Sequence, residues 1–125
     1  MARHRARLAA PRRGDVYFVS LDPTVGAEIQ KTRPAVVVQN DSANRASPIT
    51  IVAAITSQTE PRSVYVTNVP IAKGDGGLTA PSLVLTNQLR SVDRQRLIRR
   101  IGALRPDTMR RVDRALAISL DLAES

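Results

Sequence analysis

The chain has 125 residues, 42% of them apolar and 24% charged, which suits one soluble domain with its own hydrophobic core and excludes a multidomain enzyme. It contains no cysteine and a single histidine, His4, which excludes disulfides, thiolate nucleophiles, histidine-pair catalysis and multi-histidine metal sites within one chain. The formal net charge of +8 favours a polyanionic partner, without distinguishing RNA, DNA or an acidic protein.

The first segment of the chain is rich in arginine. Residues 1–13 carry five arginines and no acidic residue, so the other residues, with 14 basic and 11 acidic side chains, have a net charge of only +3. The longest apolar runs, residues 35–38 and 51–55, fall far short of the roughly 18 residues of a membrane-spanning helix. We expect a cytoplasmic protein without membrane contact, in which residues 1–12 form a flexible basic extension to a single domain over residues 13–125. A nucleic-acid-binding arm is the alternative interpretation of the extension.

Two strands and a long loop are predicted next. Residues 14–21 are rich in β-forming side chains and end at the turn signal Asp22-Pro23. The segment from Asp22 to Thr32 is longer than a simple hairpin needs, which makes it a candidate functional loop. Residues 34–38 are apolar and β-branched on both faces, which predicts a buried strand that ends at the polar residues 40–42.

The middle of the chain predicts further strands. Residues 49–55 are apolar and β-branched, and residues 64–67 alternate, which predicts a third strand and a half-exposed fourth strand. A glycine-rich turn at residues 73–77 precedes a fifth predicted strand over residues 82–86. Residues 97–104 fit either a strand or a helix, because their apolar spacing suits both.

A helix is predicted at the end of the chain. Pro106 and Asp107 suit the first turn, and apolar residues then recur at three- and four-residue steps, at Met109, Val112, Leu116 and Leu120. This stripe is expected to pack against the core or a second subunit. Strands followed by a helix favour a mainly β fold with α (α+β), a small antiparallel barrel with helices on one side.

Several motifs occur together and in order along the chain. They are RGDVYFV at residues 13–19, LDPTVGAE at 21–28, KTRPAVVV at 31–38, AITSQ at 54–58 and LTNQLRSVD at 85–93. The first three resemble the opening of the MazF/PemK family of toxin endoribonucleases, the fourth resembles its second active-site segment, and the fifth resembles a later block. The resemblance covers about residues 13–122.

The resemblance implies an SH3-like barrel of the PemK/CcdB type, a homodimer, a cognate antitoxin, and metal-independent, cofactor-free cleavage of single-stranded RNA at short sequences. It assigns catalysis to Arg33 and Thr56. It gives supporting or substrate-binding roles to Glu28, Lys31, Ser57, Gln58 and Gln88. Asn87 departs from the family pattern, because related sequences often have an acidic residue there.

The residues themselves suit this chemistry. RNA carries its own nucleophile, the 2'-hydroxyl, so an enzyme can cleave it by aligning that group and stabilising the charge on the phosphoryl oxygens. The guanidinium of Arg33 matches a phosphate, and the hydroxyl of Thr56 can donate to the phosphate or align the attacking oxygen. Glu28 either orients Arg33 or acts as a base. The expected products carry 2',3'-cyclic phosphate and 5'-hydroxyl ends.

Other functions fit parts of the same pattern. A non-catalytic toxin of the CcdB type would bind a topoisomerase, and a plain RNA-binding module would bind RNA without cutting it. The cluster of Arg94, Arg96, Arg99 and Arg100 fits a solvated face and a phosphate-tracking surface equally.

Overall fold

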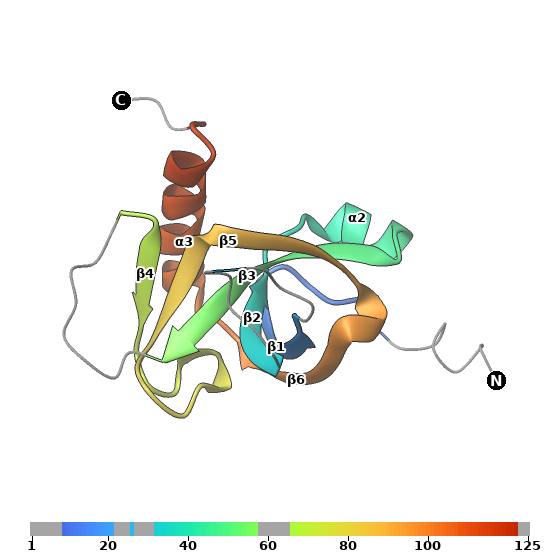
Figure 1. Ribbon diagram of the computed structural model, residues 1–125, viewed down its shortest axis with the longest axis horizontal. Coiled ribbons are helices and arrows are strands. Elements are labelled where there is room, and N and C mark those ends of the chain that lie inside the picture. Colours follow the sequence, from blue (N-terminus) through green and yellow to red (C-terminus); the bar gives the residue numbers. More distant parts are fainter. Residues whose placement is uncertain (1–8, 22–25, 27–31, 58–65, 123–125) are drawn as a thin grey trace.

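The computed structural model describes residues 9–21, 26, 32–57 and 66–122, and within these residues the fold is a curled antiparallel sheet with one long helix (Figure 1). The strands run in the order β4-β5-β3-β2-β1-β6. Their bounds are β1 Asp15–Ser20, β2 Thr32–Val37, β3 Ile49–Ser57, β4 Asn68–Ile71, β5 Ser82–Asp93 and β6 Leu97–Ala103. The helices are α2 Asp41–Ala46 and α3 Pro106–Ser119, and two short 3₁₀ turns are η1 Asp75–Gly77 and η2 Arg94–Arg96.

The sheet curls where its longest strand, β5, carries a bulge that shifts its register with β3. β5 pairs with β4 and with the second half of β3 through residues 82–85, and with the first half of β3 through residues 89–93. The register shifts between Ala53 and Ala54, whose partners are Leu89 and Leu85, so residues 86–88 form a bulge in β5. β5 and β6 then wrap around β1 and β2 (Figure 1). The predicted mainly β fold with a C-terminal helix is confirmed.

The core has two parts, one on each face of the sheet. Side chains alternate along β2, so Val36 belongs to the part under α3, while Ala35 and Val37 belong to the part inside the curl. The part under α3 also contains Val16, Ala53, Ile55, Val69, Ile71, Leu78, Val84, Leu104, Val112 and Ala115. The inner part also contains Val19, Leu21, Val52, Ala54 and Val92. Burial on both faces explains why the second predicted strand is continuously apolar.

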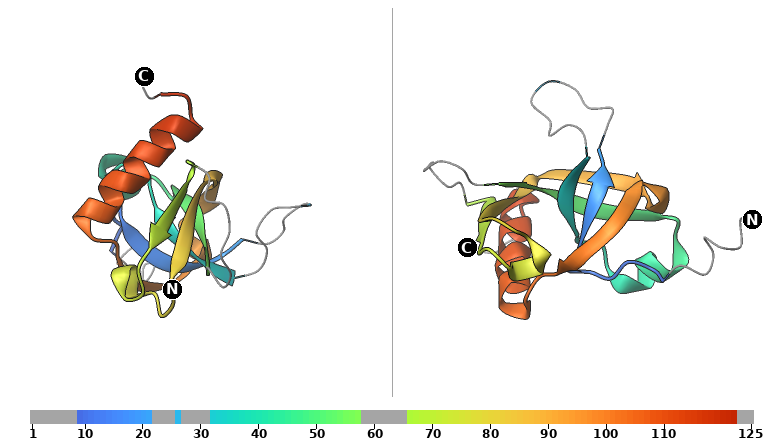
Figure 2. Two further views of the ribbon diagram at one scale, coloured as in Figure 1. Left: turned by 90° about the vertical axis from the view of Figure 1, so that its left-hand side faces the viewer. Right: turned by 90° about the horizontal axis from the view of Figure 1, so that it is seen from below.

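Helix α3 packs beside β4 and β5, as both figures show (Figure 2). The carboxylate of Asp75 fixes its start, since it accepts hydrogen bonds from the backbone N–H of Arg105 at 2.9 Å and from the hydroxyl of Thr108 at 2.6 Å. Of the predicted stripe, Val112 is buried and Met109 and Leu116 pack against the core. Leu120 is 52% exposed, which corrects its predicted place in the packed stripe, because the helix ends at Ser119.

Three elements differ from the prediction: β4, α2, and β5, which continues to Asp93 instead of ending at residue 86. The fourth strand is Asn68–Ile71 instead of residues 64–67: residues 66–67 lie in a turn, and residues 64–65 lie outside the described part. Proline at position 70 is tolerated there because β4 is an edge strand. The prediction also missed α2, whose first turn is capped by the side chain of Asn40, which accepts from Ala43 N at 2.8 Å. Residues 97–103, left open between strand and helix, form β6.

Candidate active site

Arg33 and Thr56 lie at the same end of neighbouring strands. β2 and β3 are antiparallel, and their paired residues include Ala35 with Ala54. Arg33 stands two residues before Ala35 in β2, and Thr56 stands two residues after Ala54 in β3, so each lies two residues beyond the last pair of this ladder, at the same end of it. Because side chains alternate, both belong to the face that carries Ala35 and Ala54, at the rim of the inner core.

The strand pairs around this rim hold the two residues in a fixed frame. Arg33 pairs with Val19 of β1, which is fully buried, and Thr56 pairs with Leu83 of β5, which is also buried. Arg33 itself is exposed and Thr56 is half-buried. The arrangement therefore combines a buried apolar base with a guanidinium and a hydroxyl at its edge, two groups that can each donate hydrogen bonds to a phosphate.

The other candidate residues have different positions. Ser57 is exposed and follows Thr56 on the opposite face of β3, paired with Ser82. Gln88 is half-buried in the bulge of β5, beside the point where β3 passes from Ala53 to Ala54, so the register does not bring it next to Thr56. The remaining candidates lie outside the described residues: Glu28, Lys31 and Gln58.

Hydrogen bonds to Thr67 and to helix α3 hold the bulge that carries Gln88. The backbone N–H and the hydroxyl of Thr86 both donate to the carbonyl of Thr67, at 2.9 and 2.5 Å. The hydroxyl of Ser119 in α3 donates to the carbonyl of Thr86 at 3.1 Å. Thr86 is fully buried while Asn87 is exposed. The bulge therefore holds Thr86 in the interior and exposes the polar side chain of Asn87 at the surface.

The predicted basic cluster makes contacts within the protein. The guanidinium of Arg99 lies 5.0 Å from the centre of the Phe18 ring, and Arg100 forms an ion pair with Asp15 at 3.2 Å. Arg96 donates to the carbonyl of Ser20 at 3.2 Å, and Arg94 approaches the carbonyl of Ser47 at 3.5 Å. We interpret these contacts as a structural role of the cluster. Arg99 and Arg100 make their contacts at the surface, where both residues are exposed.

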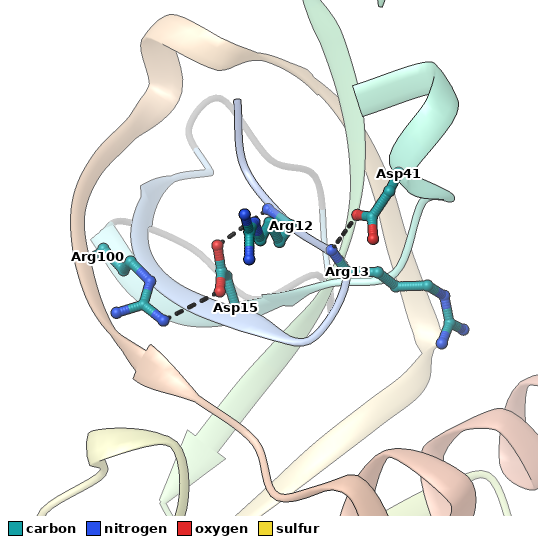
Figure 3. A network of polar contacts seen from close by, with 5 residues as sticks. All are labelled: Arg12, Arg13, Asp15, Asp41 and Arg100. Carbon is teal, nitrogen blue, oxygen red and sulfur yellow. Dashed lines mark hydrogen bonds and ion pairs between the residues drawn. The ribbon is translucent and has the colours of Figure 1, made fainter. Parts of the chain in front are cut away.

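A second polar network lies at the other end of β1, away from Arg33 (Figure 3). Asp15 accepts from the backbone N–H of Arg12 at 2.9 Å and pairs with Arg100, and Asp41 accepts from the backbone N–H of Arg13 at 2.7 Å. The Arg13 hydrogen bond lowers the pKa of Asp41. We interpret this network as structural, because it joins the start of β1 to α2.

One more side chain, in the middle of β1, had no signal in the sequence. Tyr17 is half-buried beside the inner core, and its pKa is raised, first by burial and then by the carboxylate of Asp15.

Among the described residues, no three His, Asp or Glu side chains gather as metal ligands, and no helix is long and apolar enough to cross a membrane.

Comparisons with known proteins show the family of the chain. Residues 12–120 match the family model of the PemK-like, MazF-like toxin of type II toxin-antitoxin systems. The chain is 45% identical over 113 residues to the endoribonuclease EndoA of Bacillus subtilis, covering 90% of this chain and 97% of that protein.

Solved structures share the fold. A mycobacterial endoribonuclease in complex with its cognate antitoxin is 26% identical, with a TM-score of 0.76 over 93% of this chain and 100% of the other. MazF from Deinococcus radiodurans has a TM-score of 0.77 at 23% identity, over 91% of this chain and 99% of that one. From the sequence match over residues 12–120 and the shared sheet and helix, the chain belongs to the PemK-like, MazF-like family of toxins from type II toxin-antitoxin systems.

Proposed function

We propose that this chain is the endoribonuclease toxin of a toxin-antitoxin pair and that it cuts single-stranded messenger RNA at short sequences. The observation that supports the proposal is the end of the β2–β3 ladder, where Arg33 and Thr56 each stand two residues beyond the pair of Ala35 and Ala54 and share the face of that pair. The 45% identity to an endoribonuclease over most of the chain supports the same reaction class.

The reaction needs no nucleophile from the protein. The ribose 2'-oxygen forms a bond to phosphorus, the bond from phosphorus to the 5'-oxygen breaks, the 2'-hydroxyl loses a proton and the 5'-oxygen gains one. The products are a 2',3'-cyclic phosphate and a 5'-hydroxyl end, and no water is consumed. Catalysis then depends on positioning and on stabilising the charge of the phosphoryl oxygens.

Each residue has a role in this scheme. The guanidinium of Arg33 donates two parallel hydrogen bonds to the phosphoryl oxygens, and the hydroxyl of Thr56 donates a third or orients the 2'-oxygen. Glu28 orients Arg33, while Lys31, Gln58 and Gln88 bind the RNA and Ser57, on the opposite face of β3, has a supporting role. Resident metal ions and cofactors have no part in the scheme.

The partners follow from the same assignment. A cognate antitoxin with an acidic, disordered segment would neutralise the arginine-rich surface and cover the RNA site. The segment would become ordered when it binds, at a cost in conformational entropy. Two copies of the chain form a homodimer, and the toxin acts in the cytoplasm, where its messenger RNA substrate is found.

The test is RNA cleavage in a chelator with mapping of the product ends. The wild-type protein should give 2',3'-cyclic phosphate and 5'-hydroxyl ends at a short recurring sequence. Removal of a preorganised donor typically costs about a hundredfold to a thousandfold in rate, so folded Arg33→Ala should lose that much. Arg110→Ala, at an exposed position of α3, removes the same charge and should cut normally.

Three outcomes would contradict the proposal. Near-normal cleavage by folded Arg33→Ala would exclude the catalytic role of that residue. RNA that is bound but not cut would indicate a binding module. Inhibition of a topoisomerase without RNA cleavage would indicate a toxin of the CcdB type.

A further inference from the structure

Two arginines from distant parts of the chain hold the end of β1. Arg90 of β5 donates from Nη1 to the carbonyl of Leu21 at 2.7 Å, and Arg96 of η2 donates from Nη1 to the carbonyl of Ser20 at 3.2 Å. In the sheet, β3 and β2 separate β5 from β1, so Arg90 reaches across the inside of the curl. We call these two hydrogen bonds the carbonyl clamp.

The clamped end of β1 is the part of that strand which pairs with the start of β2. Ser20 pairs with Thr32, and Val19 pairs with Arg33. The side chain of Leu21 is 1% exposed and packs in the inner core, so this residue is held by its side chain and by its carbonyl. The clamp thus holds the two residues that follow Val19, the partner of Arg33.

The physical need for such a clamp lies in the position of Arg33. It lies near the beginning of a strand, next to residues 22–31 of the chain, and strand ends fray unless tied down. Hydrogen bonds from a guanidinium to a carbonyl are charge-assisted, and Arg90 is half-buried, which reduces their screening by water. A displacement of about 1 Å at a catalytic group can lower a rate by about a hundredfold, so a firm backbone at Arg33 has catalytic value.

We infer that Arg90, with Arg96, is a positioning residue for Arg33: it holds the carbonyl end of β1 and through the β1–β2 pairs sets where the Arg33 guanidinium stands. This inference rests on the proposed function, because it gives Arg90 a role only through the catalytic group. Arg90 does not touch the RNA in this scheme. Its loss should therefore lower kcat with little change in KM.

The first test is independent of RNA. Amide hydrogen exchange is measured on full-length wild type, Arg90→Ala and Arg110→Ala, well below their unfolding temperatures. Arg90→Ala should speed exchange at residues 19–21 and 32–33 and leave α3 unchanged, and Arg110→Ala should match the wild type. Unchanged exchange at residues 19–21 and 32–33 in Arg90→Ala would overturn the inference, whatever the activity.

The second test is kinetic, with the same variants, Arg90→Lys and a double-mutant cycle. Arg90→Ala should lower kcat by about 10- to 100-fold with KM changed by less than about threefold, and Arg90→Lys, which keeps a cationic donor, should recover part of the rate. In the Arg33→Ala background, Arg90→Ala should add no further loss of kcat.

The outcomes separate this inference from the proposed function. If Arg33→Ala is inactive and Arg90→Ala cuts at the rate of Arg110→Ala, the positioning role is wrong and the proposed function stands. Additive losses in the double variant would also overturn it, because they show that Arg90 does not act through Arg33. If Arg33→Ala keeps its activity, both the catalytic assignment and the positioning role fail.

Discussion

Arg13 and Asp41, 28 positions apart in the chain, are joined by a hydrogen bond of 2.7 Å from the backbone N–H of Arg13 to the carboxylate of Asp41. The side chain of Arg13 adds a hydrogen bond to the carbonyl of Val38 at 2.8 Å and an ion pair with Asp113 of α3 at 2.6 Å. Arg13, two residues before β1, is therefore tied to α2, to the residue after β2 and to the C-terminal helix. These contacts set the start of the strand whose other end pairs with Arg33.

The bond between Arg13 and Asp41 predicts a pH dependence of stability. The pKa of Asp41 is lowered, mainly by the Arg13 N–H, so the carboxylate stabilises the fold above its ordinary pKa of 3.8 and this contribution is lost as pH falls through the lowered value. In thermal unfolding between pH 2 and pH 6, Asp41→Asn should lose less stability on acidification than the wild type. Asn40→Ala, which removes a cap of the same helix without a titrating group, should keep the wild-type slope. Identical slopes for Asp41→Asn and wild type would disprove the linkage.

Asn44 is the buried centre of α2, and its loss should destabilise the whole domain. It is 0% exposed, and its side chain accepts from the hydroxyl of Thr50 at 2.7 Å and from Gln39 Nε2 at 3.0 Å and donates to the carbonyl of Gln39 at 2.9 Å. Asn44→Ala removes the partner of the fully buried Thr50 hydroxyl and two hydrogen bonds to Gln39, for a loss of about 2–4 kcal/mol in urea unfolding. Ser42→Ala, on the exposed side of the same helix, should change stability by less than about 0.5 kcal/mol. Equal effects from the two variants would contradict this role.

Two glycines near η1 should respond differently to alanine. Gly74 and Gly77 both have positive φ, at 95° and 76°, but a Cβ at Gly77 would lie 2.5 Å from the carbonyl oxygen of Ile101, whereas a Cβ at Gly74 would meet no atom within 4 Å. Gly74→Ala should therefore cost about 1–2 kcal/mol for its backbone conformation, and Gly77→Ala should cost about 1–3 kcal/mol more for the clash with β6. Chemical denaturation of both variants measures the difference, and equal losses would show that η1 moves away from β6 without penalty.

The sequence predicted the elements whose signals are local. β1, β2 and β3 have β-branched runs that only a strand explains, and α3 has a proline at its start and an apolar stripe. β4 was misassigned because Pro70 argues against a strand unless the strand is known to be at an edge. α2 was missed because six residues with a buried Asn44 show no helical apolar period.

The residues of the candidate site were predicted from short motifs, but the contacts that hold them were not. Arg33 and Thr56 came from the family resemblance, and the opposition of the two strands that carry them is a property of the β2–β3 register. The contact from Arg90 to Leu21 joins residues 69 positions apart across the curl of the sheet, and no local pattern signals it. Long-range positioning contacts of this kind depend on topology, which a single sequence leaves open.

The hydroxyl of Thr56 gives the most direct test of the rim of the inner core. Thr56→Val keeps the β-branched shape beside Leu83 and replaces the hydroxyl with a methyl group, so the fold and the β3–β5 pairing should survive while kcat falls by about 10- to 100-fold. Thr56→Ser keeps the hydroxyl and should retain most of the rate. Single-turnover cleavage of a short RNA separates the chemical step from binding, and circular dichroism checks the fold. Since a donor to the reacting phosphate acts in the transition state, the loss should fall on the chemical step, and a Thr56→Val protein that cuts as fast as the wild type would remove Thr56 from the mechanism.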